Sequence, residues 1–156
     1  MDFVEYVQSL VQQCGWSLTG VFSPNSVGIG FDIGRYQIPV YVAGFIENSK
    51  GKHTLAIRTE SAPVQLNDDD GKIFAHTFME WVLERNYELD NGVCWSLIEF
   101  EGNEKGLVAQ ARFATDDLTL QMFHDAVNDV LMERVWFLCR IRPDIGAELN
   151  EAFTKG

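Results

Sequence analysis

Apolar residues recur at helical spacing at the start of the chain, and the pattern then changes to that of strands. Between residues 2 and 14 the apolar positions are Phe3, Tyr6, Val7, Leu10 and Val11, which share one side of a helix. From residue 16 to 45 the chain is rich in β-branched and aromatic residues and is interrupted by SPNS and by GR. This pattern predicts three strands joined by tight turns, and HTLAIRTE predicts a fourth strand.

The second half of the chain returns to helical spacing, forms one hairpin and ends in helix. The run VQLNDDDGKIFAHTFMEWVLERNYEL has a period of 3.6 residues, and VCWSLIEFE and LVAQARFA, separated by GNEKG, predict a β-hairpin. TLQMFHDAVNDVLMERVWFLCRIR predicts a long helix that ends at Pro143, before a short final helix. We therefore predict one α+β domain over residues 1–156, with an antiparallel β-sheet, helices packed on one face and the order α-β-β-β-β-α-β-β-α.

The long helix near the C-terminus has more apolar surface than one core-facing side requires. Its predicted core stripe comprises Leu120, Phe123, Val127, Val130, Leu131 and Leu138. Met132 and Trp136 lie instead on the side that is otherwise polar. In a two-layer domain they are either covered by the C-terminal segment, through Ile145, Leu149 and Phe153, or exposed for a partner.

The first strand of the hairpin also carries large apolar side chains on both of its faces. Alternation places Val93, Trp95 and Leu97 on one face and Cys94, Ile98 and Phe100 on the other. One face of the strand packs against the core, so the apolar side chains on the other face also need to be covered by another segment or by a partner. The residues that we predict to bind a partner or to form a dimer are Trp95, Ile98, Phe100, Met132 and Trp136.

Composition narrows the classes of partner. The chain has 12 Lys and Arg residues against 23 Asp and Glu residues, a net charge of -11, which repels phosphate backbones and anionic lipids. We therefore expect neither nucleic acid nor a membrane as a partner. Three cysteines in apolar surroundings are typical of reduced core residues. The first residues show no signal peptide, and no apolar run is long enough to span a membrane, so we predict a cytoplasmic protein.

The motifs that could carry chemistry do not match their templates. In GIGFDIG, Ile33 stands where a dinucleotide fingerprint has its third glycine. In NDDDG, Leu66 and Thr77 stand at the first and last ligand positions of a calcium loop, so the aspartates are more typical of a helix cap. The histidines share no metal-ligand spacing: His53, His76 and His124. We predict no catalytic residue, no cofactor and no metal site.

Two alternatives to a binding module stay open from the residues. One is a small-ligand sensor or an enzyme with a pocket between sheet and helices, for which the polar residues would be Gln110 and Arg112 opposite Glu99 and Glu101. Cross-strand pairs are the commoner role of such residues. The other alternative is a structural subunit of a larger assembly.

In the order of its elements and in length the chain resembles the YbjN family, whose domain is related in fold to type III secretion chaperones. The resemblance is carried by MDFVEYVQSLVQQCGW, VGIGFDIGRYQIPVYVAGF, FAHTFMEWVLERN and the hairpin followed by DDLTLQMFHDAVNDVLME. The extension RIRPDIGAELNEAF departs from the family outline. The resemblance implies a small, acidic, cytosolic, homodimeric protein that binds a protein or peptide client without transforming it, with the client held on apolar patches and sheet edges.

Overall fold

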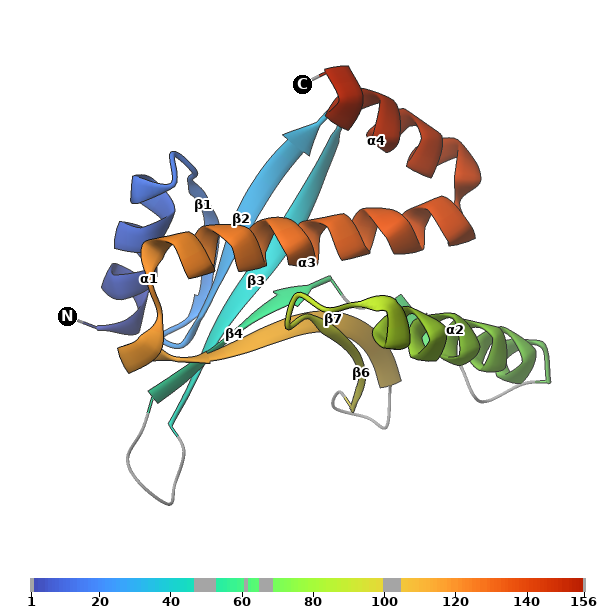
Figure 1. Ribbon diagram of the computed structural model, residues 1–156, viewed down its shortest axis with the longest axis horizontal. Helices are drawn as coiled ribbons and strands as arrows, with labels where there is room; N and C mark the ends of the chain where they lie inside the picture. The colour runs from blue at the N-terminus through green and yellow to red at the C-terminus, as the bar shows by residue number, and fades with distance from the viewer. Residues whose placement is uncertain (1, 47–52, 61, 65–68, 100–104, 156) are drawn as a thin grey trace.

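The computed structural model describes residues 2–46, 53–60, 62–64, 69–99 and 105–155 (Figure 1). The helices are α1 (Phe3–Gln13), α2 (Asp69–Glu88), α3 (Leu120–Ile141) and α4 (Pro143–Lys155), with the short 3-10 turn η2 (Thr115–Asp117) before α3. The strands are β1 (Leu18–Ser23), β2 (Ser26–Ile33), β3 (Tyr36–Ile46), β4 (His53–Thr59), β5 (Ala62–Val64), β6 (Cys94–Glu99) and β7 (Lys105–Ala114). The predicted α+β order is confirmed, α4 is the short final helix expected after the long helix, and β5 is an addition.

All strand pairs in the sheet are antiparallel, and β7 pairs with three other strands, β4, β5 and β6. The order is β1-β2-β3-β4-β7, and one half of β7 pairs with β4 while the other half pairs with β5. Strand β6 pairs with β7 on its opposite side, from Cys94 opposite Gln110 to Glu99 opposite Lys105. Among the described strands, β1, β5 and β6 each pair with one other strand only, so each has an unpaired edge.

One face of the sheet packs against the helices and forms the core. Alternate residues of β2, β3, β4 and β7 meet the apolar side of α3, where Phe123, Val127 and Val130 are fully buried. A capping box formed by Asp2 and Glu5 fixes the start of α1. Helix α4 turns back from the end of α3 toward the β2–β3 hairpin (Figure 1). This return places a third segment beside α3 and β3.

Three expectations from the sequence need correction. Leu120, assigned to the core stripe of the long helix, is 37% exposed because it is the first residue of α3. Cys94 is exposed, although all three cysteines are free. Glu99 lies opposite Lys105, with Oε1 at 3.5 Å from Nζ, rather than opposite Gln110 or Arg112. The hairpin register decides this last point, and local composition does not encode it.

Candidate functional site

The structure separates the five residues predicted to contact a partner. Trp95 is buried, with 4% of its surface exposed, Ile98 and Trp136 are half-buried, and Met132 is 43% exposed. Phe100 lies outside the described residues. Only Met132, among the four that can be placed, presents a largely accessible apolar side chain.

A buried polar cluster joins α2, α3 and β6 beneath this surface. The guanidinium of Arg85 donates two hydrogen bonds to Glu133, from Nε to Oε1 at 2.9 Å and from Nη2 to Oε2 at 2.8 Å. The indole Nε1 of Trp95 donates to Oε1 of the same carboxylate at 3.0 Å. Hydrogen bonding to Glu133 raises the pKa of Arg85. Three elements are therefore tied to one carboxylate.

Trp136 is covered, but the contacts that cover it differ from those expected. Arg85 lies over its ring at 5.1 Å and Arg140 at 4.7 Å from the ring centroid, and the rings of Trp95 and Phe137 lie within 6.3 Å. Helix α4 packs through Ile145 and the buried Leu149 beside Leu138. Positions 136 and 138 lie roughly 200° apart around a helix, so α4 covers a different side of α3.

The structure therefore predicts different results for Trp136 and Met132. Trp136→Ala should lower the free energy of unfolding by about 2 kcal/mol, since it removes ring contacts and two cation–π contacts. Met132→Ala, one helical turn away and 43% exposed, should change it by less than about 0.5 kcal/mol. Urea denaturation followed by circular dichroism measures both. Equal losses for the two variants would show that Met132 is a core residue.

The outer edge of β6 is closed at one end by a side chain. Asn86 of α2 accepts a hydrogen bond from the backbone N–H of Trp95 at 2.7 Å and donates one to its carbonyl oxygen at 3.0 Å. The Asn86 amide thus takes the place of a neighbouring strand at this one residue. An amide that satisfies both backbone groups of an edge residue caps that part of the edge.

Successive residues of a strand direct their backbone N–H and C=O groups to opposite edges. The hydrogen bonds around Trp95 therefore show which other residues of β6 face the outer edge. Ala109 of β7 lies opposite Trp95, and its backbone N–H donates to Thr59 Oγ1 on the side of β7 away from β6. Trp95 and Ala109 are therefore a pair that exchanges no backbone hydrogen bond. Ser96 and Ile98 then direct their backbone groups toward β7, while Leu97 and Glu99 direct theirs outward. Within the described chain, β6 pairs with β7 alone. Among the described residues, the outward backbone groups of Leu97 and Glu99 therefore have no strand partner.

Exposed apolar side chains accompany this edge and the nearby helices. Leu97 on β6 is 45% exposed, and Leu83 and Tyr87, one helical turn apart on α2, are 67% and 93% exposed. None of these was selected from the sequence. Leu97 and Asn86 could have been found only with the register of β6 known, because the same strand could have had either edge covered.

The polar residues considered for a small-ligand site do not converge. Gln110 accepts from Arg58 Nε at 3.0 Å and donates to Ser96 Oγ at 3.2 Å, forming a polar row across the sheet. Burial lowers the pKa of Arg58, and the positive charge of Arg112 lowers it further. Glu99 faces Lys105, and Glu101 lies outside the described residues. The row ties β4, β6 and β7 together.

No group of three or more His, Cys, Asp or Glu side chains in the described part of the chain could hold a metal ion. None of the helices placed by the structure is long and apolar enough to span a membrane.

Similarity to known proteins is found in the fold of the chain and not in its sequence. No protein-family model matches the chain, and no curated protein matches its sequence. In fold, the chain is similar to the crystal structure of YbjN, a proposed transcription regulator from E. coli. The match covers 97% of this chain and 92% of that chain, with a TM-score of 0.45 and 11% sequence identity. The order of elements in the sequence had indicated a resemblance to the same family.

Proposed function

We propose that this protein is a non-enzymatic module that binds an extended protein or peptide segment, in a chaperone-like or regulatory role. The observation that supports this function is the edge of β6, where the backbone groups of Leu97 and Glu99 face outward next to the residue capped by Asn86. An extended segment can add to such an edge as a further strand, with backbone hydrogen bonds giving affinity.

The side chains around the edge favour an apolar and basic segment. Leu97 would contact apolar residues of the added strand on the helix-covered face, and Ile98 would contact those on the opposite face. Glu99 is an exposed carboxylate at the end of β6, and the chain carries a net charge of -11. A basic segment would therefore associate faster, and salt would slow it.

Two proline variants test the proposal at neighbouring positions. Leu97→Pro removes an outward N–H and should leave the β6–β7 ladder intact, with a stability change of about 1 kcal/mol or less. Ile98→Pro removes an N–H that faces β7 and should lower the free energy of unfolding by about 1–3 kcal/mol. Stability is measured by urea denaturation.

Binding is measured by fluorescence anisotropy with labelled peptides in which apolar and basic residues alternate. Leu97→Pro should abolish binding while the protein stays folded, whereas Leu97→Ala should retain most of it. Undiminished binding by folded Leu97→Pro would rule out strand addition at β6. If Leu97→Pro instead converts a dimer into a monomer, the added segment belongs to a second copy of the chain.

We further propose that the protein is a cytoplasmic homodimer, and that Met132 contributes to partner contacts. The exposed apolar side chains on α2 and α3, among them Leu83 and Met132, support self-association of the helical side. Light scattering over a dilution series should give twice the mass of one chain. Leu83→Lys should lower this mass without unfolding the protein, because the side chain is 67% exposed. A monomeric mass at every concentration would contradict the dimer.

A further inference from the structure

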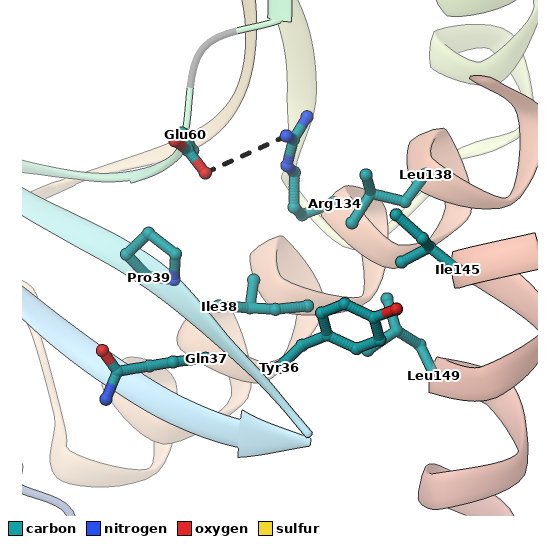
Figure 2. A pocket seen from close by; sticks show the side chains of 9 residues that line it. All are labelled: Tyr36, Gln37, Ile38, Pro39, Glu60, Arg134, Leu138, Ile145 and Leu149. Atoms are coloured by element: carbon teal, nitrogen blue, oxygen red, sulfur yellow. Dashed lines mark ion pairs between the residues drawn. The ribbon is translucent and has the colours of Figure 1, made fainter. Parts of the chain in front are cut away.

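A pocket of about 170 Å³ lies between β3, α3 and α4 (Figure 2). Its walls are largely apolar and come from all three elements: Tyr36, Ile38, Pro39, Leu138, Ile145 and Leu149. Arg134, Glu60 and Gln37 are the polar residues that line it. A mostly apolar cavity with a few polar groups is the usual form of a small-molecule site.

Arg134 is a buried cation with incomplete pairing. Its side chain is 12% exposed, and its Nη1 atom is buried without a hydrogen-bond partner in the described structure. Its Nη2 atom lies 3.9 Å from Oε2 of Glu60, too far for a hydrogen bond. Burial lowers the pKa of Arg134, and the charge of Glu60 opposes that shift in part. A guanidinium has five N–H donors, and leaving one buried and unpaired is unfavourable.

The arrangement of the lining residues separates a charged end from an apolar body. Figure 2 shows Arg134 and Glu60 at one end of the pocket and Tyr36 and Leu149 at the other. The volume of about 170 Å³ is close to that of an engineered cavity of roughly 150 Å³ that binds benzene. A ligand with one small ring or a branched chain therefore fits.

The charges of the lining residues indicate which kind of anionic group the pocket would bind. Arg134 is the single cation among the nine lining residues, and Glu60 lies on the same side. A doubly charged phosphate would be repelled by Glu60 and by the net charge of the chain, whereas a carboxylate carries one charge and matches the planar fork of a guanidinium. We propose that this pocket binds a small carboxylate with an apolar body, and that the guanidinium of Arg134 receives the carboxylate.

Glu60 has a defined part in this proposal. Its side chain is 52% exposed, so it can turn toward solvent when a ligand carboxylate takes its place beside Arg134. Removing its charge should therefore tighten binding, while removing the charge of Arg134 should weaken it. Opposite effects of two substitutions in one pocket distinguish anion recognition from simple filling of an apolar space. The site is separate from the edge of β6, and neither proposal depends on the other.

The test uses the full chain and defined probes in isothermal titration calorimetry. Benzoate and 4-methylpentanoate are compared with their neutral amides and with inorganic phosphate, up to about 10 mM, which would nearly saturate a site with a Kd of about 1 mM. A short peptide ending in a free C-terminal leucine is compared with its amidated form. These probes separate a free carboxylate from the carboxylate of a chain terminus.

Three variants give the expected pattern. Arg134→Met should weaken carboxylate binding about tenfold or more, the loss of one charge-assisted hydrogen bond, and should stay folded because an apolar side chain replaces a buried charge. Glu60→Gln should strengthen binding. Arg112→Met is the control, since Arg112 is exposed on β7 and is not among the residues that line the pocket, and it should leave binding unchanged.

Each outcome decides the proposal. Binding of the carboxylates but not their amides, lost in Arg134→Met, supports it. The same dependence on Arg134 seen with the free C-terminal peptide alone also supports it and identifies a chain terminus as the source. Equal binding of benzamide and benzoate, equal binding by Arg134→Met, or no binding of any carboxylate would overturn it.

Discussion

Replacement of Arg85 by alanine is expected to lower the free energy of unfolding by about 3 kcal/mol, because it leaves the carboxylate of Glu133 buried without its cation. The Glu133 side chain is 3% exposed and that of Arg85 is 26% exposed. The indole of Trp95 would remain as the hydrogen-bond donor that the structure gives to this carboxylate. In a chain of this length the loss corresponds to a fall in Tm of about 6–12 °C.

The chain offers an exposed ion pair of the same geometry as a control. Arg35 donates to both carboxylate oxygens of Glu148, at 3.0 and 3.1 Å, but the two side chains are 72% and 47% exposed. Arg35→Ala should therefore change the free energy of unfolding far less than Arg85→Ala does. Thermal and urea denaturation measure both variants, and equal losses would contradict the burial of the Arg85–Glu133 pair.

The double variant Arg85→Met with Glu133→Leu separates the ion pair from the packing around it. Apolar side chains of similar volume can replace a buried pair with little loss. We expect the double variant to recover most of the stability that Arg85→Ala loses. A loss in the double variant as large as the sum of the two single losses would mean that Arg85 and Glu133 contribute independently rather than as a pair.

Gly146→Ala is the second substitution with a large expected effect. A Cβ atom at this position would lie 2.3 Å from the Cα and 2.6 Å from the Sγ of Cys139, so α4 would have to move away from α3. Overpacking of this kind lowers the free energy of unfolding by about 1–3 kcal/mol. On an undocked helix the same change would instead stabilise by about 1 kcal/mol, since alanine favours helix. The sign of the effect therefore reports whether α4 is docked.

The thiol of Cys139 provides a second measurement of the same movement. Asn150 donates to its Sγ at 3.2 Å, so α4 covers it. In a Cys94→Ser background, which removes the exposed cysteine, Gly146→Ala should increase the rate at which Cys139 reacts with an alkylating reagent. Ala147→Gly, at an exposed position of α4, is the control: it should lower stability by about 1 kcal/mol without raising that rate as much. An unchanged rate in Gly146→Ala would contradict the close contact of the two helices.

The apolar spacing of the long helix also signals two buried charges, Glu133 and Arg134. Glu133 follows Val130 by three residues and precedes Phe137 by four, and Arg134 lies midway between Val130 and Leu138. Both spacings place a charged residue on the apolar side of a helix, where it needs a partner. The partners, Arg85 and Glu60, lie on other segments, so the spacing predicts that a partner exists but does not identify it.

The sequence alone determined the elements of this protein, their order and the antiparallel sheet with helices on one face. These depend on local periodicity and turn residues, which are written in neighbouring positions. Only the tertiary structure decided that Trp136 contacts two arginines, that Asn86 caps the β6 edge at Trp95 and that Arg134 lines a pocket beside α4. Each of these features joins segments far apart in the chain. Strand register and helix docking bring such segments together, and neither is specified by the pattern of a single segment.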